Sequence, residues 1–283
     1  MLFRSFGVAQ IGKSFRNEVT PGNFIFRTRE FEQMEMEYFV PPADAQRWFE
    51  EWCRIRMDWY TDLGLRPDHL QLRAHDPDEL SHYSSATSDV EYLFPIGWSE
   101  LEGIANRGDF DLTQHAKHSG DKLEYFDQQS GERYVPHVVE PAAGVGRSML
   151  AFLCDAYDED EIGGEKRTVL KLHPKMAPVK VAVLPLVRKD GQPELARDVY
   201  AALRRAGLQA EYDEGGSIGR RYRRQDEIGT PYGVTIDHQS LEDGTVTVRD
   251  RDTLDQDRVA IDELPAMLTE RLGAEWRSPK LGA

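Results

Sequence analysis

Two short segments near the start of the chain carry arginine, glutamate and aromatic residues more densely than packing alone requires. They are Phe15–Glu18, which reads Phe-Arg-Asn-Glu, and Arg27–Glu35, which reads Arg-Thr-Arg-Glu-Phe-Glu-Gln-Met-Glu. Arginine offers a planar fork for phosphate oxygens, glutamate accepts a hydrogen bond from an amino group, and an aromatic ring can stack on a base. Together these chemistries indicate an adenine-nucleotide site. The alternative is a solvated hairpin with cross-strand ion pairs.

The two segments are predicted to be β-strands, since a turn is expected between them. The connecting residues 20–23 read Thr-Pro-Gly-Asn, which is typical of a tight turn. In this arrangement Phe15, Ile25 and Phe31 supply the apolar positions of the strands. The charged residues then project into a polar space where a ligand can bind.

A second candidate for ligand binding lies around Gly144 and Gly146. A predicted strand ending at Glu140 leads through these glycines into a predicted helix with apolar residues at helical spacing. Glycine allows a backbone to approach a ligand closely, and the start of a helix favours anions. Arg147 follows at a position where a phosphate could lie. Such a pattern is weak evidence alone and gains weight beside the first site.

The order Phe-Arg-x-Glu, a loop, and Arg-x-x-x-Phe-x-x-x-Glu resembles motif 2 of the class II aminoacyl-tRNA synthetases, and its surroundings resemble the glycyl-tRNA synthetases. Three further segments agree: Gly97–Ala105, Glu140–Arg147, which resembles motif 3, and His173–Pro178, which opens a segment similar to an anticodon-binding domain. The resemblance extends over essentially the whole chain. It implies an α+β fold, with a partial class II catalytic domain built on an antiparallel sheet and then a small α/β anticodon-binding domain.

In that family a long part of the catalytic domain, including the motif 1 dimer interface, precedes motif 2. Here only a short segment precedes Arg16. The resemblance therefore implies the C-terminal portion of a synthetase that lacks motif 1.

The resemblance also implies roles for individual residues toward ATP. Arg16 and Arg147 would be the catalytic residues, with Arg16 on the α-phosphate and Arg147 with Arg27 on the γ-phosphate. Glu18 would bind the adenine amino group, and Phe31 would stack on adenine. Glu100 would bind Mg²⁺. The full ATP-binding set comprises Arg16, Asn17, Glu18, Phe26, Arg27, Thr28, Arg29, Glu30, Phe31, Glu100, Leu101, Gly144, Val145, Gly146 and Arg147.

A glycine pocket is implied in the same way, and its carboxylates are natural partners for an ammonium group. The set comprises Phe31, Glu32, Gln33, Met34, Glu35, Glu140, Pro141, Ala142, Ala143 and Gly144. The family often has serine after the proline, so Ala142 removes one possible hydroxyl contact. A crowded pocket would exclude larger amino acids sterically, and no editing domain is expected.

The implied function is a glycine–tRNA ligase that uses ATP and Mg²⁺ to form glycyl-adenylate and transfers glycine to tRNA(Gly), as a homodimer in the full-length family. One alternative is a non-catalytic accessory protein on the same fold that binds nucleic acid or a partner. Another is a regulatory module that binds ATP without depending on glycine.

Composition limits the remaining possibilities. The chain has 283 residues, 40% of them hydrophobic, and a formal net charge of −15. No run approaches the roughly 18 apolar residues of a membrane span, so a cytoplasmic protein without membrane association is expected. Cys53 and Cys154 are too few for a disulfide framework or a paired-cysteine zinc site.

The acidic charge argues against a protein that coats nucleic acid, so any tRNA contact is expected to be local. The best candidate is the segment that contains Arg220, Arg221, Tyr222 and Arg223. Its arginines could bind phosphates while its tyrosine stacks on a base. The alternative is a solvated helix face that pairs with Asp226 and Glu227.

Periodicity predicts the elements that position these residues. In the first block we expect a helix over 44–63 with a core-facing stripe of tryptophans, strands at 70–73, 89–94 and 134–140, and a short helix at 100–107. The second block alternates strands (179–186, 208–212, 232–237, 245–249) with helices (193–206, 262–272), which indicates an α/β sheet.

The predicted domains are 1–163 and 178–283, and the acidic run from Asp155 to Glu161 is expected to be a solvated linker that continues over 164–177. All histidines are interpreted as structural.

Overall fold

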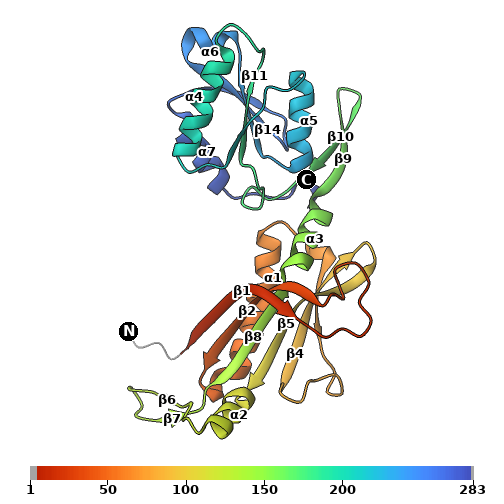
Figure 1. Ribbon diagram of the computed structural model, residues 1–283, viewed down its shortest axis with the longest axis vertical. Helices are drawn as coiled ribbons and strands as arrows, with labels where there is room; N and C mark the ends of the chain where they lie inside the picture. The colour runs from red at the N-terminus through yellow and green to blue at the C-terminus, as the bar shows by residue number, and fades with distance from the viewer. Residues whose placement is uncertain (1–4, 282–283) are drawn as a thin grey trace. The chain divides into compact units, whose positions relative to one another are not determined.

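The structure is a computed structural model that describes residues 5–281 (Figure 1). The chain divides into two compact units, the first ending at Cys154 and the second beginning at Asp155. The boundary therefore lies nearer the start of the chain than the predicted one. Among the described residues, no helix is long and apolar enough to cross a membrane.

The first unit is built on one six-stranded sheet in which every neighbouring pair of strands is antiparallel. This confirms the predicted antiparallel catalytic sheet. In spatial order the strands are β1 (Phe6–Phe15), β2 (Glu30–Val40), β8 (His137–Gly144), β5 (Gly97–Gly108), β4 (Ala86–Phe94) and β3 (Leu70–Ala74).

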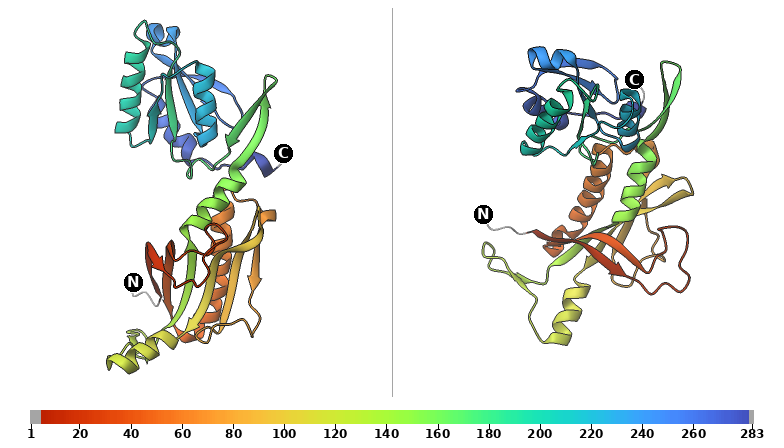
Figure 2. Two further views of the ribbon diagram at one scale, coloured as in Figure 1. Left: turned by 45° about the vertical axis from the view of Figure 1, so that its right-hand side comes forward. Right: turned by 45° about the horizontal axis from the view of Figure 1, so that its top comes forward.

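Three helices accompany this sheet, and the longest lies along one face of it (Figures 1 and 2). They are α1 (Ala45–Asp62), α2 (Phe110–Ser119) and α3 (Val145–Ala156), with 3₁₀ turns at Pro42–Asp44 and Pro67–His69 and a small hairpin of β6 (Tyr125–Phe126) and β7 (Arg133–Tyr134).

The face of the sheet under α1 is the core of the unit. Glu102 of β5 bonds to α1, and its neighbour on the same face, Ile104, is fully buried. Side chains alternate along a strand, so Gly103 and Ala105 point to the opposite face. One face of β5 thus packs against α1, while the other is available for ligands.

Two predictions for this unit are wrong. Residues 100–107 form part of β5 and not a helix, because this segment is paired on both sides, with β4 and with β8. The tryptophans of α1 are only half-buried, and the fully buried stripe of the helix is Ala45, Phe49, Cys53 and Tyr60. The tryptophans flank that stripe, and two of them pack edge-on against Tyr38 of β2.

The second unit contains a five-stranded sheet with helices on it, as the alternation of predicted strands and helices indicated. Its order is β12 (Ala210–Tyr212), β11 (Val181–Pro185), β13 (Tyr232–Ile236), β14 (Thr245–Asp250) and β15 (Gln256–Ala260), parallel over the first three strands and antiparallel thereafter. The helices are α4 (Gln192–Arg205), α5 (Ile218–Ile228), α6 (His238–Asp243) and α7 (Leu264–Gly273), followed by a 3₁₀ turn at Pro279–Leu281.

The acidic segment after α3 is a hairpin and not a linker. β9 (Tyr157–Ile162) pairs with β10 (Glu165–Leu170), and Gly163 and Gly164 form the turn with positive φ angles of 59° and 84°. Asp160 accepts hydrogen bonds from the buried guanidinium of Arg167, and Asp158 lies 2.7 Å from the Lys171 ammonium. These cations offset the acidic charge and allow the segment to be ordered.

The contact between α1 and the sheet depends on a buried carboxylate. Glu102 has only 1% of its surface exposed and accepts hydrogen bonds from Arg56 at 2.7 Å and from the Tyr60 hydroxyl at 2.8 Å. We expect Glu102→Ala to lower the free energy of unfolding of the first unit by about 3 kcal/mol, because it leaves a buried guanidinium without its counter-charge.

Urea denaturation followed by tryptophan fluorescence measures this loss. Glu51→Ala is the matched control, since that carboxylate pairs with Arg54 on the exposed face of the same helix. An exposed pair of this kind contributes at most about 0.5 kcal/mol. Equal losses in the two variants would contradict the anchoring role of Glu102.

Candidate active site

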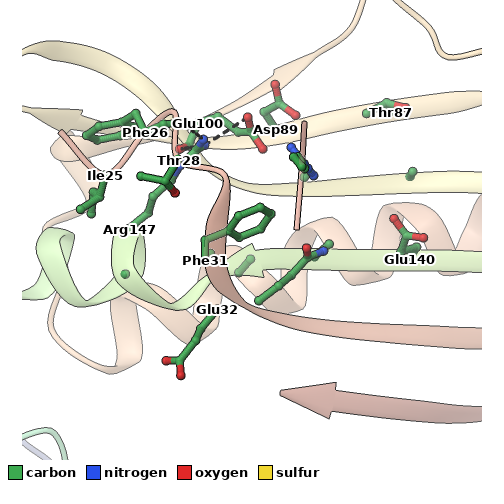
Figure 3. Close-up of a pocket in the computed structure, with 18 of the residues that line it drawn as sticks. Ile25, Phe26, Thr28, Phe31, Glu32, Thr87, Asp89, Glu100, Glu140 and Arg147 are labelled. Atoms are coloured by element: carbon green, nitrogen blue, oxygen red, sulfur yellow. Dashed lines mark hydrogen bonds and ion pairs between the residues drawn. The ribbon is translucent and has the colours of Figure 1, made fainter. Parts of the chain in front are cut away.

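A pocket of about 480 Å³ lies on the sheet face opposite α1 (Figure 3). It is formed by β2, β8, β5 and β4 together with the loop of residues 16–29 and the first turn of α3. Segments far apart in the sequence therefore share one cavity, and both predicted ligand-binding segments contribute to it.

The loop between β1 and β2 is longer than the predicted turn. It runs from residue 16 to 29, closed by a hydrogen bond from the Arg16 amide to the Arg29 carbonyl at 3.0 Å. Asn23 and Phe24 adopt positive φ angles, so the chain reverses there and Ile25 lies in the loop instead of a strand. Ile25 nevertheless lines the pocket.

Arg16 and Phe31 form the centre of the end of the pocket where the sequence predicts a nucleotide, referred to as the nucleotide end. The Arg16 guanidinium lies 5.1 Å from the centroid of the Phe31 ring, and both residues line the pocket. Glu18 also lines it and accepts a hydrogen bond from Arg27 at 3.1 Å, while Arg29 donates to the Glu18 carbonyl at 3.0 Å. A fork for phosphate, a ring for stacking and a carboxylate for an amino group thus lie at one end of the cavity.

Arg147, at the start of α3, joins three segments. Its guanidinium donates to the Glu100 carbonyl at 2.9 Å and to the Phe26 carbonyl at 3.0 Å, and it lies 3.2 Å from the Glu100 carboxylate (Figure 3). It also lies over the Phe26 ring, 5.3 Å from the centroid. The aliphatic chain of Arg147 lies beside Gly144, and Ile25 of the loop lies beside Gly146, so both glycines line the pocket under these side chains. The two predicted motifs are in direct contact.

Glu100 and Asp89 flank the glycine at position 103. A Cβ atom there would lie 3.7 Å from an Asp89 carboxylate oxygen and 3.9 Å from a Glu100 carboxylate oxygen. Two carboxylates that converge from β4 and β5 match the oxygen ligands that Mg²⁺ prefers. The residues present therefore fit the magnesium that the resemblance implies.

The pocket does not contain every residue of the predicted sets. Among those predicted to bind ATP, the residues in the lining are Arg16, Glu18, Phe26, Thr28, Glu30, Phe31, Glu100, Gly144, Gly146 and Arg147, which leaves Asn17, Arg27, Arg29, Leu101 and Val145 outside it. Leu101 is buried. The other residues outside the lining belong to the loop and the helix start that frame the pocket.

The predicted glycine residues also divide into two groups. Those in the lining are Phe31, Glu32, Gln33, Glu140, Ala142, Ala143 and Gly144. Met34 and Pro141 lie at positions of β2 and β8 whose side chains alternate to the opposite face, so the structure does not bring them into the pocket. Glu35 lies beside Glu140 and accepts a hydrogen bond from the Gln33 amide at 2.9 Å.

The far end of the pocket is rich in carboxylates. Glu140 lies 2.9 Å from Arg107, which also bonds to Asp111 at 2.6 and 3.1 Å and stacks on Tyr83 at 4.2 Å. Burial raises the pKa of Glu140 to about 8 against the attraction of Arg107, and the charge of Glu37 adds to the rise. Burial likewise raises the pKa of Glu37.

Sequence reasoning missed one wall of the pocket. It consists of His75, Glu79, Ser81, Tyr83, Thr87, Asp89, Gly103 and Ala105. His75 belongs to this wall, and its imidazole lies 2.8 Å from the Asp89 carboxylate. Residues 103 and 105 are small and alternate with the buried residues 102 and 104, which is the pattern of a strand. The prediction of a helix over 100–107 did not take this alternation into account.

The arginine-rich segment is α5, and burial excludes part of the predicted tRNA contact. Arg221 is 2% exposed and donates to the carbonyls of Pro185 and Leu186, while Tyr222 bonds to Thr235 at 2.5 Å. Neither side chain is free to meet RNA. Arg220 is exposed, and Arg223 is half-buried.

The raised pKa of Glu140 gives a pH-dependent stability. The native state holds a proton that the unfolded chain has lost between pH of about 4.5 and 8, so this group lowers the free energy of unfolding as pH rises through that window. We expect Glu140→Gln to remove this contribution. The variant should therefore gain stability relative to the unsubstituted protein from pH 5 to 9, measured by urea denaturation. A constant difference across this range would contradict the assignment.

Comparison with protein families agrees with the two units. Residues 6–156 match the family model described as the tRNA synthetase class II core domain (G, H, P, S and T), and residues 180–271 match the model of the anticodon binding domain.

The chain is similar to curated proteins named glycine–tRNA ligase. It is 58% identical over 267 residues to that of Caldanaerobacter subterraneus subsp. tengcongensis, a match that covers 94% of this chain and 57% of that protein. It is 57% identical over 275 residues to that of Streptomyces coelicolor, covering 94% and 60%. The chain thus spans less than two thirds of the length of these relatives.

Among solved structures, the chain resembles a prolyl-tRNA synthetase from Cryptosporidium parvum complexed with L-proline and AMP. The TM-score is 0.68 at 20% sequence identity, and the match covers 95% of this chain and 56% of that one. At this identity the similarity shows the fold.

Proposed function

Since the chain belongs to the class II tRNA synthetase family by its match over residues 6–156, we propose that it serves as a glycine–tRNA ligase. It would use ATP to convert glycine to glycyl-adenylate and then transfer glycine to tRNA(Gly). The observation that carries this proposal is a single pocket with an arginine and aromatic end and a carboxylate end on one sheet face. Relatives named glycine–tRNA ligase support it, and none of them favours the non-catalytic alternative.

The first step joins a glycine carboxylate oxygen to the α-phosphorus of ATP, and the bond from that phosphorus to the pyrophosphate oxygen breaks. Catalysis requires in-line positioning and neutralisation of charge, since no proton transfer is needed. Arg16 would bind the α-phosphate with adenine stacked on Phe31. Arg27 and Arg147 would bind the γ-phosphate, and Glu18 would accept from the adenine amino group.

Glu100 and Asp89 would hold Mg²⁺ at the nucleotide end. When bound, the ion neutralises charge on the phosphates. The ion pair with Arg147 would orient the Glu100 carboxylate for this role.

The carboxylate end would bind the glycine ammonium. Glu35 and Glu140 would accept its hydrogen bonds. The Gln33 amide donates a hydrogen bond to the Glu35 carboxylate and so orients it. Ala142 and Ala105 line the pocket beside Glu140. A larger amino acid would have to displace these packed groups, so glycine would be selected by steric exclusion.

We further propose that the second unit binds tRNA, that the whole protein is a homodimer and that it acts in the cytoplasm. Arg220 and Arg223 are the members of the predicted contact with accessible side chains. They would bind phosphates, since an exposed arginine can move to meet a backbone oxygen.

Glycine-dependent exchange of pyrophosphate into ATP tests the first step. We expect the chain to catalyse exchange with glycine and not with alanine. Arg16→Ala should reduce the exchange rate by at least about a hundredfold, since the Arg16 guanidinium would stabilise charge on the α-phosphate in the transition state. Arg54→Ala, an exposed arginine on α1, is the matched control. Exchange that persists in Arg16→Ala, or that does not depend on glycine, would contradict the proposal.

Filter binding of tRNA(Gly) at several salt concentrations tests the contact of the second unit. Arg220→Ala should weaken binding and reduce the slope of log affinity against log salt by about one, because one phosphate contact is lost. Arg277→Ala is the control, since that side chain is 86% exposed and pairs only with Glu275 among the described residues. If both variants gave the same slope of log affinity against log salt, Arg220 would not belong to the tRNA contact.

A further inference from the structure

Glu37 of β2 is a carboxylate that the proposed reaction has not used. In the register that pairs Glu35 with Ala142 and Tyr38 with Val139, Glu37 lies directly opposite Glu140 on the neighbouring strand. Oxygen atoms of Glu35, Glu37 and Glu140 all lie within 4.8 Å of one another. Like charges directly opposite in an antiparallel pair destabilise a sheet, so this arrangement needs a compensating positive charge or a proton.

The surrounding elements provide only part of that compensation. Arg107 of β5 pairs with Glu140 at 2.9 Å but also binds Asp111 of α2 through two hydrogen bonds. β1 places Val8 and Gln10 opposite Glu37 and Glu35, and neither is charged. The phenol of Tyr83 stacks on Arg107. Three carboxylates, Glu140, Glu37 and Asp111, therefore share one guanidinium, and Glu35 lies beside two of them.

We propose that Glu37 is a further binding residue of the amino-group subsite: in the free protein it shares one proton with Glu140, and the ammonium group of the amino acid displaces that proton. This inference rests on the proposed function, because it takes glycine as the ligand of the carboxylate end. The ammonium brings the positive charge that the cluster lacks, and it offers three donors to the three carboxylates. The displaced proton passes to the solvent, so charge balances.

The electrostatics of the cluster agree with this arrangement. Burial is the largest cause of the raised pKa of both Glu37 and Glu140, and each is influenced by the other. When two such groups interact strongly, the proton belongs to the pair. With the pair titrating at about 8, affinity for glycine should fall about fivefold from pH 8 to 7 and about ninefold from pH 7 to 6.

The test is a pH titration of ¹³C-labelled glutamate carboxyls by NMR in buffer with EDTA, which keeps metal ions from competing for the cluster. We expect one carboxyl signal to titrate near pH 8 in the free protein. It should move below pH 7 when glycine saturates the site. In Glu37→Gln, an isosteric neutral change, the titration should move to lower pH because the charge and hydrogen bond of Glu37 are lost, whereas in Glu50→Gln, on the exposed side of α1, it should not move.

Isothermal calorimetry with glycine in two buffers of different ionisation enthalpy counts the protons released. About one proton per glycine is expected at pH 7, and fewer in Glu37→Gln. Glutamates that all titrate below about pH 6, or a high titration that stays at the same pH in Glu37→Gln, would overturn the shared proton. If glycine bound without releasing a proton, the ammonium would not displace the shared proton, but the proposed ligase function would not be contradicted. A shared proton with no binding of glycine would contradict both.

Discussion

The alternation of side chains along the paired strands β2, β8 and β5 is the constraint on which the rest of the structure depends. In each strand, one set of residues packs under α1, and the intervening set faces the pocket. Gly103 and Ala105 can line the cavity only because Glu102 and Ile104 are buried on the other side. A shift of pairing by one residue would bury the carboxylates of the site and expose the core.

The two ends of the pocket have different electrostatic character for the same reason. At the nucleotide end, Arg147 of α3 bonds to the loop and to β5 and therefore links three segments of the pocket wall. At the other end, the register sets Glu37 against Glu140, with Arg107 as the only guanidinium bonded to Glu140 among the described residues. A sheet that optimised its own stability would avoid this pairing, so it is best understood through the cation that it can bind.

Much of the site chemistry could be predicted from the sequence, because the residues of each motif are close together along the chain. The types and spacing of Arg16, Glu18 and Phe31 indicate one ligand-binding segment, and the glycine pattern before Arg147 indicates the other; all four residues line the pocket. The wall formed by His75, Asp89 and their neighbours could not be found in this way, since only strand pairing brings it to the motifs.

The errors have a common physical cause, which is that tertiary pairing overrides local pattern. The acidic residues after α3 looked solvated, yet the buried Arg167 orders them in a hairpin. Arg221 and Tyr222 looked like an RNA contact, yet the terminal guanidinium nitrogens of Arg221 and the hydroxyl of Tyr222 are bonded inside the second unit. In both cases the buried arginine donates to a carbonyl distant in sequence, Arg167 to that of Arg251 and Arg221 to that of Pro185, and no local window contains these contacts.

We propose that one pocket binds an adenine nucleotide and an amino acid ammonium at the same time. This can be measured by calorimetric binding of a non-hydrolysable glycyl-sulfamoyl-adenosine, beside its alanyl analogue and sulfamoyl-adenosine alone. We expect the glycyl compound to bind at least about a hundredfold more tightly than either of the others, because only it fills both ends without a clash. Equal affinities for the three compounds would contradict it.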